Sequence, residues 1–265
     1  MRIAPALALP FLLCAPQLAR SQSRDGDFRW ERRLGAGQVV HARNINGDIR
    51  VTPSSSGRVE IVGVRRGSSR SADRLNAAVT ETADGIIVCI VRADADDECD
   101  GNGYHHRSND DNDDWGNASM NLEIRLPSNV EIDATSVSGN VDVSGAQGDV
   151  RAGSVSGDIH LDGLRATSIE ARTVSGEIVA GVESLSGNGP LSFKSVSGDV
   201  KLDLPRNLDA DLSMSSVSGQ LDSEFQMTLG GRTSRRRIEA RIGRGGRELS
   251  LTTVSGDVRL RMHRD

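Results

Sequence analysis

The sequence predicts an all-β fold, a single-stranded, parallel β-helix-like solenoid with coils of about 20 residues and an irregular β cap on its N-terminal side. Three observations lead to this prediction. The glycines of a recurring phrase are 18, 19, 22, 21 and 37 residues apart, as in stacked repeats. Apolar and polar residues alternate within the phrase, as in a half-buried strand. The phrase itself occurs six times, after a looser copy at 44–49: SVSGNV (136–141), SVSGDI (154–159), TVSGEI (173–178), SVSGDV (195–200), SVSGQL (216–221) and TVSGDV (253–258).

The alternation also predicts the core. In each copy, the valine and the apolar residues after the glycine have the same phase and should point to one side. The glycine suits a bend or a close approach of neighbouring coils. A charge placed in this ladder, as in Val196→Asp, is therefore expected to unfold the protein. The predicted core consists of Val137, Val141, Val143, Val155, Ile159, Leu161, Val174, Ile178, Val196, Val200, Leu202, Val217, Leu221, Val254, Val258 and Leu260.

Residues 1–23 are typical of a secretory signal peptide. Arg2 is followed by an apolar run that is too short to span a membrane, and small residues precede a plausible cleavage point. Cys14 suggests a lipoprotein signal as the alternative, but Leu13 stands where a small residue is normally required. We expect export to the periplasm, to the cell surface or into the medium.

The remaining chain divides into two regions. Residues 24–130 read as short strands separated by Gly, Ser, Asn and Asp clusters, with room for a short helix at 69–79, and form an N-terminal β region and cap. This region contains an acidic loop at 93–117. Residues 131–265 form the repeat solenoid, which carries an arginine-rich hairpin near its C-terminal end.

Charge and cysteine content narrow the function classes. Without residues 1–23 the chain has 30 Lys and Arg against 37 Asp and Glu, so it is acidic and does not suit nucleic-acid binding. No later segment is apolar enough to cross a membrane. Cys89 and Cys99 are expected to form a disulfide, because an exported chain meets an oxidising environment. The alternative is a pair of free thiols.

Two sets of carboxylates are candidate metal ligands, and Ca²⁺ is the only cofactor that they suggest. Asp96, Glu98 and Asp100 match the opening of a calcium-binding loop, although Arg107 stands where a bidentate Glu is required. The alternative is a solvated loop. In stacked coils, Asp158, Glu177 and Asp199 would form a column whose repulsion a divalent cation relieves. Their alternative role is to accept hydrogen bonds from backbone N–H groups of the turn.

An arginine-rich segment lies between the last two copies of the phrase. Guanidinium groups pair bidentately with phosphate and carboxylate, so the segment is a candidate site for an anionic envelope polymer. The alternative is a solvated face that balances the acidic loop. The candidate anion-binding residues are Arg235, Arg236, Arg237, Arg241 and Arg244.

The repeats resemble a known bacterial family. The order LEIRLPSNVEIDATSVSGNVDVSG (122–145), GDVRAGSVSGDIHLDGL (148–164) and LTTVSGDVRL (251–260) is similar to that of the bacterial putative-adhesin family of domains of unknown function. The resemblance covers the chain from about residue 28 onward. It implies an exported protein of β-strand repeats, and it brings no catalytic residues.

These observations predict a non-enzymatic, exported, adhesin-like or scaffold protein that binds an envelope polysaccharide or a surface protein through its surface. One alternative is a calcium-responsive binding module that uses the acidic loop. A second is a polysaccharide-active enzyme of the β-helix type. The enzyme is disfavoured because one Tyr, two Trp and four Phe leave few aromatic platforms for sugars. In addition, no nucleophile, base and orienting group stand out together.

Overall fold

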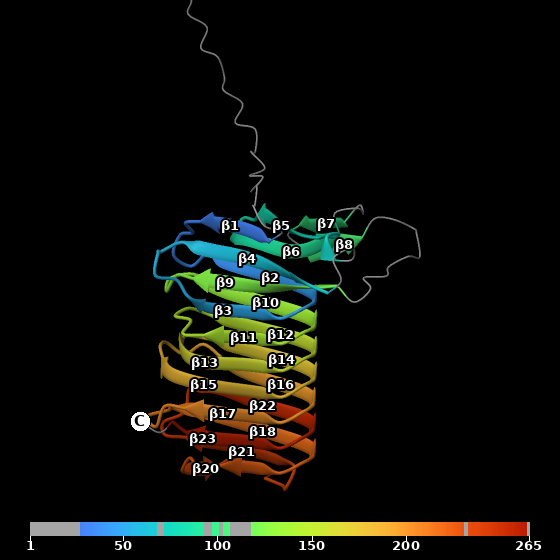
Figure 1. The fold of residues 1–265 in the computed structure, drawn as a ribbon. Coiled ribbons are helices and arrows are strands. Elements are labelled where there is room, and N and C mark those ends of the chain that lie inside the picture. Colours follow the sequence, from blue (N-terminus) through green and yellow to red (C-terminus); the bar gives the residue numbers. More distant parts are fainter. Residues whose placement is uncertain are drawn as a thin grey trace, which may run out of the picture.

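The computed structural model describes residues 27–67, 72–92, 97–100, 103–106, 118–230 and 233–263. All 23 elements in these residues are strands, so the prediction of an all-β fold is confirmed. They form a ten-stranded sheet, an eleven-stranded sheet and a two-stranded hairpin (Figure 1). A strand, β5 (Leu75–Glu81), occupies residues 75–79 of the segment 69–79, in which a short helix had room. The predicted signal peptide and Asp96 lie outside the described residues.

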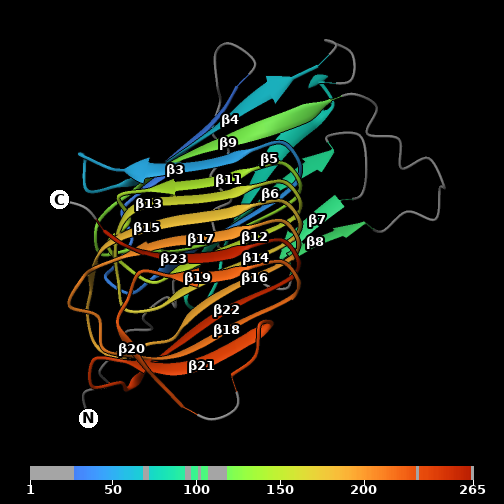
Figure 2. The same cartoon turned by 90° about the horizontal axis from the view of Figure 1, so that it is seen from below.

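In the middle of the chain, consecutive strands alternate between the two large sheets. Each coil has one strand in each sheet, joined at the Val-Ser-Gly phrase, and neighbouring coils pair in parallel, with Ser138 opposite Ser156 and Ser156 opposite Ser175. Figure 2, which looks along the stack, shows the two sheets as facing layers. The eleven-stranded sheet receives β10 (Glu131–Ser138), β12 (Val150–Ser156), β14 (Ile169–Ser175) and β16 (Leu191–Ser197). The ten-stranded sheet receives β11 (Val141–Ser144), β13 (Ile159–Ala166), β15 (Ile178–Leu185) and β17 (Val200–Leu204).

At the N-terminal end, the looser phrase NINGDI forms a coil of the same kind. Its strands β2 (Val39–Asn46) and β3 (Ile49–Pro53) pair in parallel with β10 and β11. On their other side β2 and β3 pair in parallel with β6 and β9, and beyond these the pairing becomes antiparallel, between β5 and β6, β4 and β9, and β1 and β4. These outer strands are β1 (Phe28–Arg32), β4 (Val59–Arg66), β6 (Gly85–Arg92) and β9 (Ser119–Leu126).

At the C-terminal end, the order of coils in space departs from their order in sequence. The last phrase joins β22 (Arg247–Ser255) to β23 (Val258–Met262), and these strands lie between the coil of β16 and β17 and the coil of β18 (Ala210–Ser218) and β19 (Leu221–Ser223). The 37-residue interval arises because the chain first forms an edge hairpin and then returns. This hairpin consists of β20 (Met227–Leu229) and β21 (Arg237–Ile242), and β21 pairs antiparallel with β18. The sheets are therefore mixed, and a purely parallel, single-stranded solenoid does not describe the chain.

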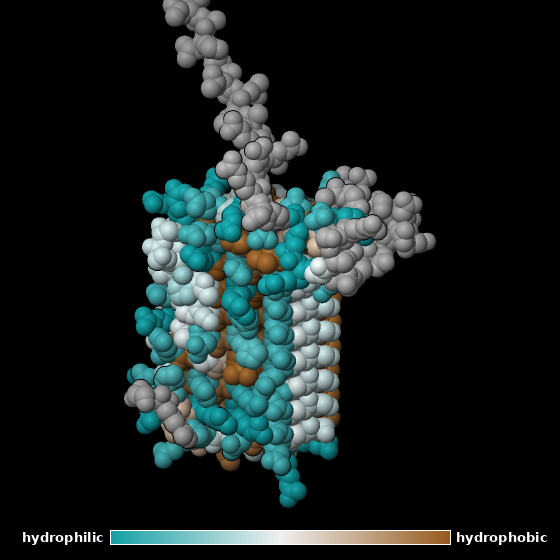
Figure 3. Space-filling model, viewed as in Figure 1, coloured by the Kyte–Doolittle hydropathy of each residue, from teal (hydrophilic) through white to brown (hydrophobic). Residues whose placement is uncertain are grey.

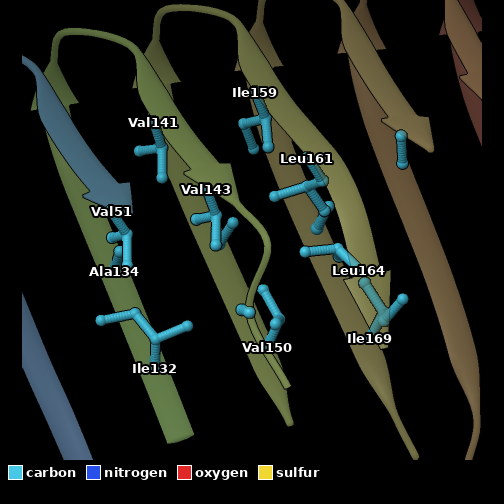
Figure 4. Packing of buried hydrophobic residues seen from close by; sticks show 14 of the residues in the cluster. Val51, Ile132, Ala134, Val141, Val143, Val150, Ile159, Leu161, Leu164 and Ile169 are labelled. Atoms are coloured by element: carbon cyan, nitrogen blue, oxygen red, sulfur yellow. The ribbon is translucent and has the colours of Figure 1, made fainter. Parts of the chain in front are cut away.

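The core lies between the two sheets. The apolar residues after each glycine are buried as predicted, and Figure 4 shows Val141, Val143, Ile159 and Leu161 among side chains from the opposite sheet. Leu221, in the edge strand β19, is only half-buried. The buried residues of this set are Val141, Val143, Ile159, Leu161, Ile178, Val200, Leu202, Val258 and Leu260.

The valine before each Ser-Gly pair is not in the core, and this part of the prediction is wrong. These valines are 44–57% exposed, because the residue before each one takes the inward position at the turn. There a hydroxyl donates a hydrogen bond to the glycine carbonyl of the neighbouring coil, as from Ser154 Oγ to Gly139 O at 2.9 Å. Val196→Asp is therefore no longer expected to unfold the protein. The exposed valines are Val137, Val155, Val174, Val196, Val217 and Val254.

The disulfide between Cys89 and Cys99 is confirmed, with the two Cα atoms 5.8 Å apart. It ties β6 to the small hairpin of β7 (Asp97–Asp100) and β8 (Gly103–His106). All eight residues of β6 are buried, and its outward side chains, including Cys89, pack with Cys99 and Tyr104 of the hairpin. The continuous apolar run in β6 is thus explained by cover on both faces.

Candidate functional site

The exposed valines and the serines that follow them form a continuous band, which we call the valine–serine stripe. It lies where the chain turns from the eleven-stranded into the ten-stranded sheet, and all twelve side chains are exposed. In Figure 3, pale and brown columns that repeat once per coil run along this margin of the stack. In spatial order the stripe consists of Val137 and Ser138, Val155 and Ser156, Val174 and Ser175, Val196 and Ser197, Val254 and Ser255, and Val217 and Ser218.

Two contacts per coil hold the stripe straight. One is the inward hydroxyl bond, which recurs at Ser195 Oγ to Gly176 O (3.0 Å) and Thr253 Oγ1 to Gly198 O (2.9 Å). The other is the close approach of the glycines, since a Cβ on Gly176 would lie 2.1 Å from the carbonyl oxygen of Gly157. The valine and serine are therefore displayed at one-strand intervals of about 4.8 Å, which places the first and last valines about 24 Å apart.

On the side of the ten-stranded sheet, the stripe is flanked by an acidic column. Its side chains accept backbone N–H groups from the neighbouring coil, as from Glu177 N to Asp158 Oδ1 at 2.8 Å and from Asp257 N to Asp199 Oδ1 at 2.9 Å. The candidate metal ligands Asp158, Glu177 and Asp199 thus lie in one column, in which Asp158 and Asp199 accept backbone N–H groups, whereas the Glu177 carboxylate contacts Lys201. The full column is Asn140, Asp158, Glu177, Asp199, Asp257 and Gln220.

Two basic side chains lie against the acidic column. Lys201 Nζ contacts Glu177 and lies 3.6 Å from Asp199 Oδ2, and the hydrogen bond to Glu177 is the main cause that raises the pKa of Lys201 above its ordinary value. Arg259 contacts Asp199 at 3.4 Å and Asp257 at 2.5 Å. In the part of the chain that the structure describes, no three His, Cys, Asp or Glu side chains are grouped to hold a metal ion.

On the side of the eleven-stranded sheet, the stripe is flanked by residues without negative charge. Lys194 is exposed and has no ion-pair partner among the described residues. Arg172 contacts Glu170 of its own strand. We call this set the neutral-to-basic column: Thr135, Gly153, Arg172, Lys194, Thr252 and Ser215.

A family model described as Toastrack DUF4097 matches residues 20–261. The chain belongs to this Toastrack family. A crystal structure of a putative cell adhesion protein from Clostridium sporogenes is similar, with a TM-score of 0.47 and 9% identity, over 89% of this chain and 100% of the other. A putative adhesin from Bacteroides fragilis has a TM-score of 0.41 and 11% identity, over 89% of this chain and 97% of its own. No curated protein matches the chain.

The two ends of this Toastrack chain carry the other predicted sites. At one end Glu98 and Asp100 lie on β7, and Asp100 Oδ1 is 3.1 Å from His105 Nε2. The arginine-rich hairpin is at the opposite end of the stack (Figure 1), so it does not lie against the β7–β8 hairpin of its own molecule. Among the described residues, no helix is long and apolar enough to cross a bilayer.

The arginines of the Toastrack hairpin differ in their partners. Arg241 Nε is 3.1 Å from Asp211 Oδ1, and Arg244 Nη2 is 2.8 Å from Asp209 Oδ2. Arg237 Nε lies 3.8 Å from Glu239 Oε1. The Arg244 backbone N–H, followed by its guanidinium group, lowers the pKa of Asp209 below its ordinary value. Two further arginines are exposed and form no ion pair with any described residue: Arg235 and Arg236.

Sequence reasoning missed the structural role of Arg247 in the Toastrack fold. Its guanidinium group is buried and donates to the carbonyl oxygens of Thr167, Ser186, Gly187 and Gly189, and this burial lowers its pKa from the ordinary value. A polar groove of about 320 Å³ lies beside it. Arg247 opens the last coil, so its side chain fixes the returning strand to loops about 60 to 80 residues earlier.

Replacing Arg247 with Met is expected to destabilise the Toastrack fold by about 2–4 kcal/mol, since four backbone carbonyls lose their donors. The matched control is Arg241→Met, which removes one exposed ion pair and should change the free energy of unfolding by less than about 1 kcal/mol. Urea denaturation measures both variants. Equal stability of the two would show that the carbonyl contacts of Arg247 do not hold the last coil.

Proposed function

We propose that this protein is a non-enzymatic, exported binding protein of the cell envelope, adhesin-like or scaffold-like, that acts through the valine–serine stripe. The observation that supports this proposal is the exposure of six valines in one unbroken line. Continuous apolar surface on a soluble protein generally marks an interaction site, because water contact with it is unfavourable.

The surroundings of the stripe suit recognition. Hydroxyl groups beside each valine supply hydrogen-bond donors and acceptors, and the stacked coils hold them at fixed intervals. The predicted signal peptide and the disulfide both suit export to an oxidising compartment. The partner is an envelope polysaccharide or a surface protein.

Arg235 and Arg236 supply a second contact for an anionic envelope polymer. Their exposure without an ion-pair partner among the described residues distinguishes them from Arg241 and Arg244, which are already engaged with Asp211 and Asp209. We expect polyanion binding to depend on the first pair more than on the second.

Co-sedimentation of the purified protein with an isolated cell-envelope fraction tests the role of the stripe. The variant Val155→Asp/Val174→Asp/Val196→Asp should bind at least about tenfold more weakly, because three charges would have to be desolvated at the contact. The control Ser184→Asp/Asn188→Asp/Asn207→Asp adds the same charge on exposed residues away from the stripe, and it should bind like the parent.

Thermal melting of both variants shows whether they are folded. Equal weakening by both variants would point to general charge repulsion, and absence of binding by the parent protein would overturn the proposal. Repeating the assay with a chelator tests the calcium-responsive alternative, which requires binding to disappear when Ca²⁺ is removed.

A further inference from the structure

The stripe has a repeat that few surfaces match. Its valines recur once per strand, in register, at about 4.8 Å, so an opposing surface contacts all six only if it has the same period. A second copy of this chain has that period. Identical ladders that meet face to face form dry, interdigitated contacts, and a surface that meets itself closes as a twofold dimer.

The arrangement of side chains across the stripe selects one orientation. Two copies can face each other with their stacks parallel, about a twofold axis along the stack, or antiparallel, about an axis across it. In the parallel pair the valine column of one copy lies opposite the serine column of the other, so large side chains meet small ones. In the antiparallel pair valine meets valine and serine meets serine, which leaves gaps along the serine column.

Charge selects the same orientation. The stripe has the acidic column on one side and the neutral-to-basic column on the other, and only the parallel pair places each column opposite its complement. Coils then meet level with each other, so Lys194 faces the partner's Asp199 and Arg172 faces the partner's Glu177. The antiparallel pair would place two acidic columns together, which is unfavourable.

We infer that the protein self-associates through the valine–serine stripe as a parallel twofold dimer. This inference rests on the proposed function and names a second copy of the chain as the partner of that surface. Lys194, exposed and without an ion-pair partner among the described residues, gains one in this dimer.

The size of the stripe sets the strength of the dimer. A band about 24 Å long and two side chains wide covers roughly 300–400 Å² per copy, about half of the roughly 800 Å² that a stable interface buries on each partner. The dimer is therefore weak, and it forms at protein concentrations of tens to hundreds of micromolar.

Analytical ultracentrifugation from about 5 to 500 µM tests the inference. The parent protein should shift from one chain toward two, and the Val155→Asp/Val174→Asp/Val196→Asp variant should stay monomeric. The control Ser184→Asp/Asn188→Asp/Asn207→Asp should dimerise like the parent. A parent that remains monomeric at 500 µM, or a stripe variant that dimerises equally well, overturns the inference.

Cysteine cross-linking tests the orientation. Ser138 lies in the first coil of the stripe and Ser218 in the last. In the parallel dimer Ser138 of one copy faces Val137 of the other, so Ser138→Cys mixed with Val137→Cys should form a disulfide-linked dimer under mild oxidation. In an antiparallel dimer Ser138→Cys would instead link to Ser218→Cys in a mixture of these two variants, and that result overturns the parallel arrangement.

The envelope assay and the ultracentrifuge separate the two proposals. If the stripe variant loses envelope binding while the parent remains monomeric, the second copy is excluded as the partner and the proposed envelope function stands. If the parent dimerises through the stripe but binds no envelope fraction, self-association stands and the envelope partner is excluded.

Discussion

Val200→Asp is expected to unfold the protein at room temperature, whereas Val196→Asp, four residues earlier in the same repeat, should melt within about 2 °C of the parent. Val200 is fully buried between the sheets, and Val196 is 46% exposed on the stripe. A buried carboxylate without a partner costs several kcal/mol or remains protonated, and the lost valine packing adds to that cost. The sum is comparable with the roughly 5–15 kcal/mol that stabilises most domains.

Circular dichroism and thermal melting of the two variants test these two expectations. Both substitutions replace Val by Asp within one copy of the phrase, so charge and composition are matched. If Val196→Asp unfolds the protein and Val200→Asp does not, the inward and outward positions around the glycine are exchanged. If both melt like the parent, the region between the sheets is not a packed core.

The two-residue period of a strand correctly predicts the buried residues after each glycine, but it wrongly predicts that the valine two residues before the glycine is buried. Alternation holds while the backbone stays extended, and Ile159, Leu161 and Val200 are buried as expected. At the turn, the inward place is taken by a hydroxyl that bonds to the neighbouring glycine carbonyl, as Ser154 does to Gly139. The following valine is then turned outward. The signal is a Ser or Thr before the repeated valine and a Ser after it, at the end of a strand where the alternation changes phase.

The placement of the last coil could not be predicted because the copies of the phrase are nearly interchangeable. Any copy offers the same glycine, hydroxyl and strand edges to a neighbour, so the repeated phrase alone does not determine which copies pair. The 37-residue interval indicated an interruption, and the hairpin of β20 and β21 occurs there. The return of β22 between β16 and β18 depends on contacts such as those of Arg247, which have no local sequence pattern.

The repeat makes the candidate site visible in the sequence, but strand alternation wrongly assigns its valines to the core. Single exposed valines are common in proteins, but six at the same place in six stacked coils form one surface. The stacking of the repeats predicts the acidic flank, since it places Asp158, Glu177 and Asp199 in one column. The hydrogen bonds that Asp158 and Asp199 accept from backbone N–H groups depend on the register of the coils, which the repeat pattern alone does not give.

Gly176→Ala is expected to destabilise the protein by at least about 3 kcal/mol and to lower its melting temperature by about 10 °C. The added Cβ would lie 2.1 Å from the Gly157 carbonyl oxygen, a distance that requires the two backbones to separate. The strain cannot relax into a side chain, because the atom in the way is backbone. It also displaces Gly176 O, which accepts the hydrogen bond from Ser195 Oγ of the next coil, so that hydrogen bond is weakened.

Gly230→Ala is the matched control, since no atom lies within 4 Å of the position that its Cβ would take. It should leave the melting temperature unchanged or raise it slightly, because alanine restricts the unfolded chain. Equal melting of the two variants would mean that the coils do not approach each other at the phrase glycines. The stripe would then lack the contact that sets the spacing of its valines. The proposed dimer requires the same spacing in both copies, so it would lose its physical explanation as well.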